Sequence, residues 1–138
     1  MRKPYFQVSN IKQFDTHARW DDCMTCSGYW AIADRDTIVY KKVVAVNGSY
    51  AIAKLMIPKG TRCLMTEGKC RAAKAVVIDI RLTGKATKLT KARSLYSGHQ
   101  FHYIPGEVVL PKPHFSNQSS TCDSGIHFFR TLREARNY

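Results

Sequence analysis

The chain has 138 residues and a formal net charge of +12, from 22 Lys and Arg against 10 Asp and Glu. Its hydrophobic fraction of 44% and charged fraction of 23% are ordinary for a globular domain and exclude wholesale disorder. No apolar run approaches the roughly 18 residues of a membrane span. Residues 1–6 carry charge with no apolar stretch behind them, so no secretory signal is predicted either.

The centre of the chain predicts a β-hairpin. Residues 37–46 are rich in β-branched side chains, and residues 50–57 alternate Ala and Lys with larger apolar side chains. Between them, Asn47-Gly48 is a dipeptide that favours the type I′ turn of a two-residue hairpin. We therefore expect a hairpin over 37–57.

Shorter strands are expected along the rest of the chain. A strand is predicted over 72–82, where strict alternation places Val77, Asp79 and Arg81 on one face. Residues 85–100 are polar and basic and predict either a short helix or a loop. Further short strands are expected at 61–65, 101–104, 107–110 and 126–129.

The last residues of the sequence predict a short helix. Thr131 followed by Glu134 three residues later is the pattern of a capping box, in which each residue satisfies a backbone N–H at the start of the helix. Leu132 and Ala135 are expected to pack inward from this helix.

Positive charge is concentrated after residue 36. Residues 1–36 are neutral, whereas residues 37–138 hold 17 Lys and Arg against 5 Asp and Glu. Such asymmetry suits a surface that faces phosphates or another polyanion. The expected organisation is one domain over 1–138, with a neutral N-terminal segment and a basic core. Its fold class is α+β, a β-rich single domain with the hairpin at 37–57 and a short C-terminal helix.

Five segments follow one another in an order that is typical of a known viral family. They are VYKKV (39–43), AKLMIPKG (53–60), KCRAAKAVV (69–77), FHYIPGEVV (101–109) and CDSGIHFF (122–129). Over residues 38–138 the chain resembles an uncharacterised domain of bacteriophages and large DNA viruses that is often attached to pentapeptide-repeat proteins. No pentapeptide repeat is present here, and residues 1–36 lie outside the family pattern.

This resemblance implies a viral protein in the host cytoplasm, and the family brings no known activity. In that setting a small basic protein is expected to bind nucleic acid or to hold a nucleotide signal used in host defence. The favoured function is non-enzymatic binding of an anionic ligand, a nucleotide or a cyclic oligonucleotide, with an anti-defence role by sequestration. Self-association is left open.

Six side chains on or beside the predicted strands are the candidates for the ligand pocket. Arg71 would clamp phosphate oxygens in a bidentate manner, the lysines would supply positive potential, and Tyr103 would offer a stacking face for a base. The six are Lys41, Arg71, Lys74, His102, Tyr103 and His127.

Three other functions are weighed against this one. The first is nucleic-acid binding through a basic loop made of Lys85, Lys88, Lys91 and Arg93. The second is an enzyme that acts on nucleotides through a Cys/His pair such as Cys122 with His127, although no group that would orient the base is evident. The third is inhibition of an acidic host protein, which the charge allows equally.

The five cysteines predict neither a disulfide framework nor a cofactor. Cys23 and Cys26 have the spacing of half a zinc site, but the sequence lacks a second closely spaced pair of ligands. They are therefore weak metal candidates, and no metal or cofactor is expected. Cysteines in an intracellular chain are more often buried as small apolar side chains.

Overall fold

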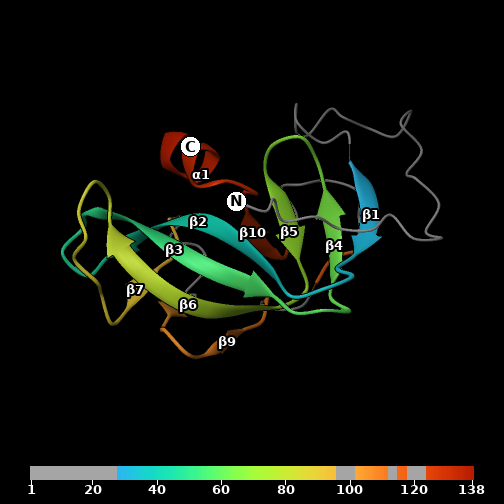
Figure 1. The fold of residues 1–138 in the computed structure, drawn as a ribbon, viewed down its shortest axis with the longest axis horizontal. Coiled ribbons are helices and arrows are strands. Elements are labelled where there is room, and N and C mark those ends of the chain that lie inside the picture. Colours follow the sequence, from blue (N-terminus) through green and yellow to red (C-terminus); the bar gives the residue numbers. More distant parts are fainter. Residues whose placement is uncertain (1–27, 96–101, 112–114, 118–123) are drawn as a thin grey trace.

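The computed structural model describes residues 28–95, 102–111, 115–117 and 124–138, which form two antiparallel sheets and one short helix (Figure 1). The elements are β1 Tyr29–Ile32, β2 Thr37–Ala45, β3 Tyr50–Ile57, β4 Arg62–Met65, β5 Cys70–Ala72, β6 Ala75–Leu82, β7 Ala92–Arg93, β8 His102–Tyr103, β9 Val108–Val109, β10 Ile126–Phe128 and α1 Leu132–Asn137. The domain is thus strand-rich, and its described helix lies at the end of the chain.

The larger sheet is built around the β2–β3 hairpin. Its strand order is β8-β7-β2-β3-β6-β9, and β2 and β3 pair from Thr37 with Ile57 to Val44 with Tyr50. The predicted two-residue type I′ turn is wrong, because the register leaves three residues, 46–48, between Ala45 and Ser49, whose backbones are joined by the Ala45 N–H donating to the Ser49 carbonyl at 2.8 Å. Gly48 closes this loop with a φ of +91°, in the left-handed region that glycine tolerates at no steric cost. The outermost strands, β8 and β9, lie at opposite edges of this sheet and pair with β7 and β6, not with each other.

The smaller sheet has the order β1-β4-β5-β10 (Figure 1). Its first strand falls in the neutral N-terminal segment, for which no strand was predicted, so part of residues 1–36 belongs to the fold. Phe129, directly after β10, forms an antiparallel bridge with Tyr40 of β2. This bridge joins the two sheets through the backbone.

The hydrophobic core lies between the two sheets. Alternate residues of β2 and β3 point inward, as Val39, Val43 and Leu55 do, and all three are fully buried. Cys63 and Cys70 from the smaller sheet are buried in the same cluster, as expected of free thiols that act as apolar side chains.

A β-bulge corrects the predicted face of β6. Lys54 pairs with Asp79 whereas the next residue of β3, Leu55, pairs with Val77, so Ile78 is the extra residue. Val77 is therefore buried in the core, while Asp79 and Arg81 point to the opposite face of the sheet. The prediction that these three residues share a face is wrong because simple alternation does not survive the bulge.

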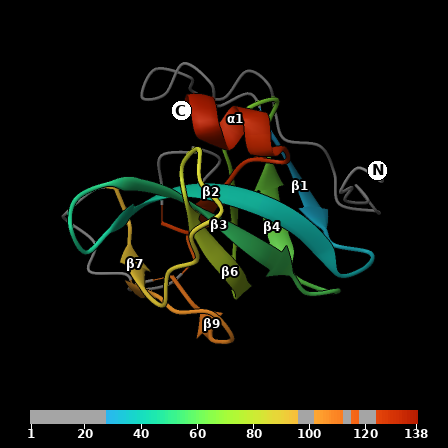
Figure 2. The same cartoon turned by 60° about the vertical axis from the view of Figure 1, so that its left-hand side comes forward.

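Helix α1 begins with the predicted capping box and packs on the outer face of β2 and β3 (Figure 2). The Thr131 side chain accepts from the Glu134 N–H, and the Glu134 carboxylate accepts from the Thr131 N–H. Ala135 is fully buried beneath the helix, but Leu132 remains 38% exposed. The prediction that Leu132 packs inward is therefore wrong, and this side chain lines the groove described below.

Thr131→Ala is expected to destabilise the protein by about 1 kcal/mol, because one helix N–H loses its acceptor and the capping box is broken. Urea unfolding followed by circular dichroism measures the change. The exposed neighbour Arg133 provides the control, since Arg133→Ala leaves the cap intact. Equal midpoints for Thr131→Ala and the parent would show that the cap contributes nothing.

Candidate anion-binding groove

The outer face of the larger sheet carries its side chains in three cross-strand rows. The strand register aligns Ile38, Met56, Val76 and Val108 in an apolar row. Two residues further along β2, Tyr40, Lys54 and Asp79 form a middle row. Two residues further again, Lys42, Ile52, Arg81 and Lys88 form a basic row, with Lys88 joined to Arg81 by an isolated bridge.

A groove of about 680 Å³ lies over the middle and basic rows. Its walls are the loop over 83–86 on one side and helix α1 on the other. The size falls within the range of pockets that hold small ligands. It is lined by Tyr40, Ile52, Lys54, Asp79, Arg81, Leu82, Thr83, Gly84, Lys85, Ala86, Leu132 and Arg136.

Four cations and one carboxylate meet in this groove. Lys54 comes from β3, Arg81 from β6, Lys85 from the loop and Arg136 from α1. The carboxylate is Asp79, whose Oδ2 lies 3.5 Å from Nη2 of Arg81. One carboxylate cannot neutralise four cations, so the groove presents a net positive potential to an incoming anion.

The loop that carries Lys85 is held close to β6 by backbone hydrogen bonds. Gly84 has a φ of +76°, which allows the chain to reverse there, and the Lys85 N–H donates to the Leu82 carbonyl at 3.1 Å. The Leu89 N–H then donates to the Ile80 carbonyl at 2.8 Å. The described part of 85–100 thus returns along β6 without forming a helix, and this path places Lys85 and Lys88 beside Arg81.

Helix α1 is fixed over the sheet by a second, smaller apolar cluster. Ile52, Phe129 and Ala135 are buried together, with Tyr40 packed against them. At the end of the helix, Nζ of Lys42 donates to the carbonyls of Arg136 and Tyr138 at 3.4 and 3.1 Å. The backbone that presents Arg136 to the groove is therefore anchored from both sides.

The sequence-predicted candidate Lys41 points the opposite way, into the interior. Its Nζ donates to the His127 carbonyl at 2.9 Å and lies 5.8 Å from the centroid of the Tyr103 ring. Burial lowers the pKa of the Lys41 ammonium from 10.5 to about 7, and the charge of Lys69 adds a smaller contribution in the same direction. Lys41, Tyr103 and His127 are thus brought together on the inner side of the larger sheet, where Tyr103 is buried and the other two are half-buried.

Lys41 is expected to make stability rise with pH above neutrality. The unfolded chain keeps this proton up to about pH 10.5, whereas the folded protein releases it near pH 7, so the unfolded state binds more protons between these values. Lys41→Met should remove this rise, and the neighbouring Lys42→Met should keep it. Urea unfolding between pH 7 and about 8, below the ordinary thiol pKa of about 8.5, measures the slope. Equal slopes for the parent and Lys41→Met would contradict this assignment.

Arg71, the predicted phosphate clamp, makes hydrogen bonds within the protein. It is fully buried, and its Nη1 donates to the carbonyls of Ser116 and Ser124 at 2.8 Å each. Its guanidinium carbon lies 4.9 Å from the ring centroid of Phe115. A Cβ on Gly125 would lie 2.9 Å from the Arg71 Cβ, so the two segments are in close contact. These contacts give Arg71 a structural role within the described residues, and its role as a phosphate clamp stays a prediction.

The other predicted pocket residues differ in exposure. Tyr103 is 1% exposed, and burial raises the pKa of its hydroxyl, so its ring is not available as a stacking face. His127 is partly buried on β10, opposite Arg71. Lys74 and His102 are exposed, on the bend before β6 and on the edge strand β8. The predicted six-residue site is therefore divided between the interior and the surface.

The four predicted nucleic-acid residues are also divided. Lys85 lines the groove and Lys88 extends its basic row. Lys91 and Arg93 are exposed further along, where Arg93 on β7 pairs with Val44 of β2 and His102 of β8. Of these four residues, Lys85 lines the groove and Lys88 lies next to it.

Among the cysteines, the described ones are unsuited to nucleophilic chemistry. Burial raises the pKa of both Cys63 and Cys70, which keeps their thiols protonated. Cys23, Cys26 and Cys122 lie outside the described residues. Within the described part of the chain, no group of three or more metal-binding side chains occurs, and no helix has the length and apolar character to cross a membrane.

The sequence did not single out three of the groove cations, Lys54, Arg81 and Arg136. Their shared signal is weak: each is a basic residue on the polar face of an amphipathic element. Recognising that they meet requires the strand register, the bulge in β6 and the position of α1, which a single sequence does not give.

The fold and the groove define a small β-rich domain with a cationic groove on its outer sheet face. The chain belongs to a family of unknown function, DUF5758, which matches residues 22–135. The match begins before β1, so it includes the first strand of the smaller sheet as well as the basic region. Searches of curated proteins and of solved structures gave no match.

Proposed function

We propose that this protein binds a small phosphate-bearing ligand, of the nucleotide type, in the groove between the 83–86 loop and α1. The observation that carries the proposal is the convergence of Lys54, Arg81, Lys85 and Arg136 on one concave site. Lysines supply point charges for phosphate, and arginines can contact its oxygens in a bidentate manner. These cations come from four separate elements, so the fold rather than the local sequence assembles the site.

Binding without chemical change is the favoured role. Acid–base catalysis needs a group that donates a proton and one that accepts it. Of the described residues that line the groove, Asp79 is the one carboxylate, and it already faces Arg81. In the viral setting implied by the resemblance, such a protein would act in the host cytoplasm by sequestering a nucleotide signal, including a cyclic oligonucleotide.

Nucleic acid is the second candidate ligand. Lys88 extends the basic row beyond the groove, and exposed Lys91 and Arg93 continue the positive charge toward β7. A strand of nucleic acid could follow this path through its phosphates, whereas a small ligand would stay in the groove.

Isothermal titration at several salt concentrations separates the two ligands. If the ligand is a nucleotide, ADP should bind with a 1:1 stoichiometry, and its affinity should depend only weakly on the salt concentration. If a nucleic acid is the ligand, a single-stranded oligonucleotide should bind more tightly, and its log affinity should fall with log salt by roughly 0.7 units per phosphate contacted. Absence of binding by both probes would contradict the proposed function.

A further inference from the structure

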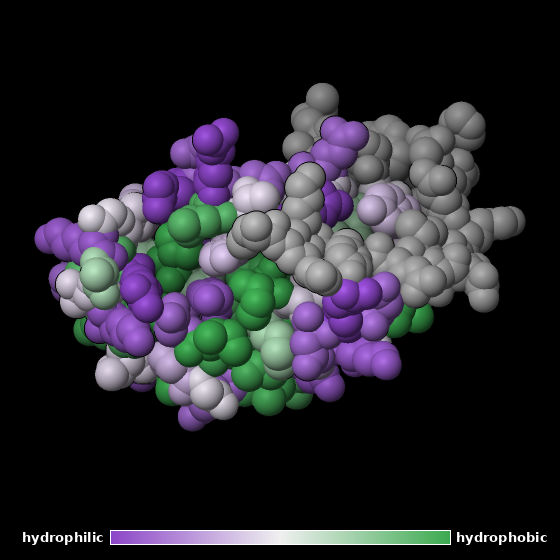
Figure 3. All heavy atoms as spheres, viewed as in Figure 1, coloured by the Kyte–Doolittle hydropathy of each residue, from purple (hydrophilic) through white to green (hydrophobic). Residues whose placement is uncertain are grey.

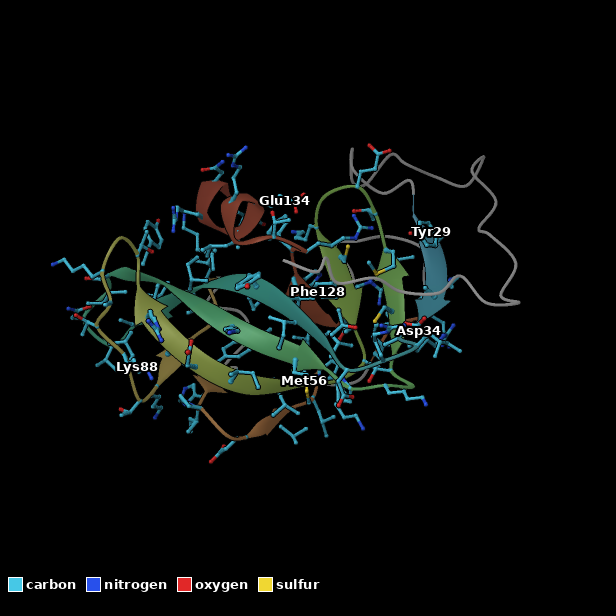
Figure 4. The ribbon with its side chains drawn as sticks, in the orientation of Figure 1. Tyr29, Asp34, Met56, Lys88, Phe128 and Glu134 are labelled. Atoms are coloured by element: carbon cyan, nitrogen blue, oxygen red, sulfur yellow. The ribbon has the colours of Figure 1, made fainter. Side chains whose placement is uncertain are left out.

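The three rows of the outer sheet face differ in chemistry in a regular order. Figure 3 shows apolar surface over the middle of β3 and β6 with hydrophilic side chains next to it. In Figure 4, Met56 of the apolar row and Lys88 of the basic row lie well apart along this face. The order along the strands is apolar, then mixed, then basic.

The spacing of the rows is that of successive residues on one face of a strand. Same-face residues are about 7 Å apart along a strand, so the three rows span about 14 Å from Met56 to Ile52. A ligand that contacts all three rows must therefore be elongated and must change its chemistry along its length.

The apolar row is open to solvent instead of being covered by the protein. Val108 is 56% exposed and Met56 and Val76 are partly buried, while α1 covers the other end of the face. A row of aliphatic side chains, with a polarizable thioether at Met56, suits the face of an aromatic ring.

Asp79 limits what can occupy the middle row. A carboxylate would repel a phosphate, and its acceptor oxygens require hydrogen-bond donors. Lys54 is directly opposite Asp79 on the neighbouring strand, in the same row. A neutral ligand group that carries hydroxyls satisfies both side chains, since a hydroxyl can donate to Asp79 and accept from Lys54.

We propose that the groove holds a nucleoside phosphate in one orientation, with its phosphates at Arg81, Lys85 and Arg136, its ribose hydroxyls at Asp79, and its base on the apolar row around Met56. This inference rests on the proposed function and adds to it the ligand class and the direction in which the ligand lies. The groove provides the phosphate and ribose positions, and the apolar row continues the site beyond the groove.

The test compares ADP, 2′,3′-dideoxy-ADP and pyrophosphate by isothermal titration against the parent and three variants. ADP should bind the parent at least about tenfold more tightly than pyrophosphate, because only ADP covers the apolar row. Met56→Ala should weaken ADP severalfold and leave pyrophosphate unchanged. Val46→Ala, at an 84% exposed apolar position in the hairpin turn, is the control and should change neither.

Asp79→Asn supplies an independent readout. Loss of the negative charge should tighten pyrophosphate binding, whereas the preference for ADP over its dideoxy form should shrink because the carboxylate acceptor is gone. Pyrophosphate that binds the parent as tightly as ADP, or a Met56→Ala variant with unchanged ADP affinity, would overturn the orientation and leave anion binding in the groove intact. Failure of all three probes to bind would overturn the proposed function as well.

Discussion

Arg81→Glu combined with Lys85→Glu is expected to lower the affinity for ADP by roughly a hundredfold or more. Each cation can donate a charge-assisted hydrogen bond to a phosphate, and such bonds contribute about 1.5–3 kcal/mol each. Reversal of both charges removes these bonds and places two carboxylates beside Asp79 in the same groove. Isothermal titration measures the loss, and circular dichroism checks that the sheet is retained.

The matched control carries the same change in net charge outside the groove. Lys59 and Lys74 are exposed and do not line it, so the double variant Lys59→Glu with Lys74→Glu should keep most of the affinity. Lys74 was also a sequence-predicted ligand residue, which makes this control informative for both sites. Equal losses in the two double variants would mean that overall charge, and not the groove, governs binding.

Arg71→Met is expected to destabilise the fold by about 4 kcal/mol. The substitution removes two charge-assisted hydrogen bonds, to the carbonyls of Ser116 and Ser124, which contribute about 1.5–3 kcal/mol each, and it loses the contact with Phe115. The Ser124 carbonyl keeps the Ser116 N–H as a donor. Arg71→Lys should restore only part of the loss, since one ammonium does not reproduce the planar fork of the guanidinium. Urea unfolding measures both variants.

The same variants decide between a structural and a ligand-binding role for Arg71. Where the Arg71→Met protein is still folded, its affinity for ADP should match that of the parent, because Arg71 does not line the groove. A variant with unchanged stability that no longer binds ADP would restore Arg71 as the phosphate clamp and contradict the structural role.

Local patterns in the sequence were sufficient for the elements that depend on local physics. The alternation over 50–57 and the turn dipeptide Asn47-Gly48 indicate two strands that the structure pairs directly. The Thr131 and Glu134 pair indicates the start of α1 in the same way. In each case the signal and the structure involve residues that are close in sequence.

The candidate site could not be predicted from such local patterns, because it depends on contacts between residues that are far apart in sequence. Alternation shows that Lys41 and Lys42 face opposite sides of β2, but not that Lys41 points into the core. The bulge at Ile78 reverses the expected face of Asp79 and Arg81 relative to Val77. Arg71 reads as a surface cation until its two carbonyl partners, more than 40 residues away in sequence, are known.

The most direct test of the groove is an ADP titration of the isotope-labelled protein, followed through its backbone amide chemical shifts. We expect the largest changes at Lys54, over 81–86 and along α1 from Leu132 to Arg136. Changes centred instead on Arg71 and His127, with the groove residues unmoved, would contradict the account.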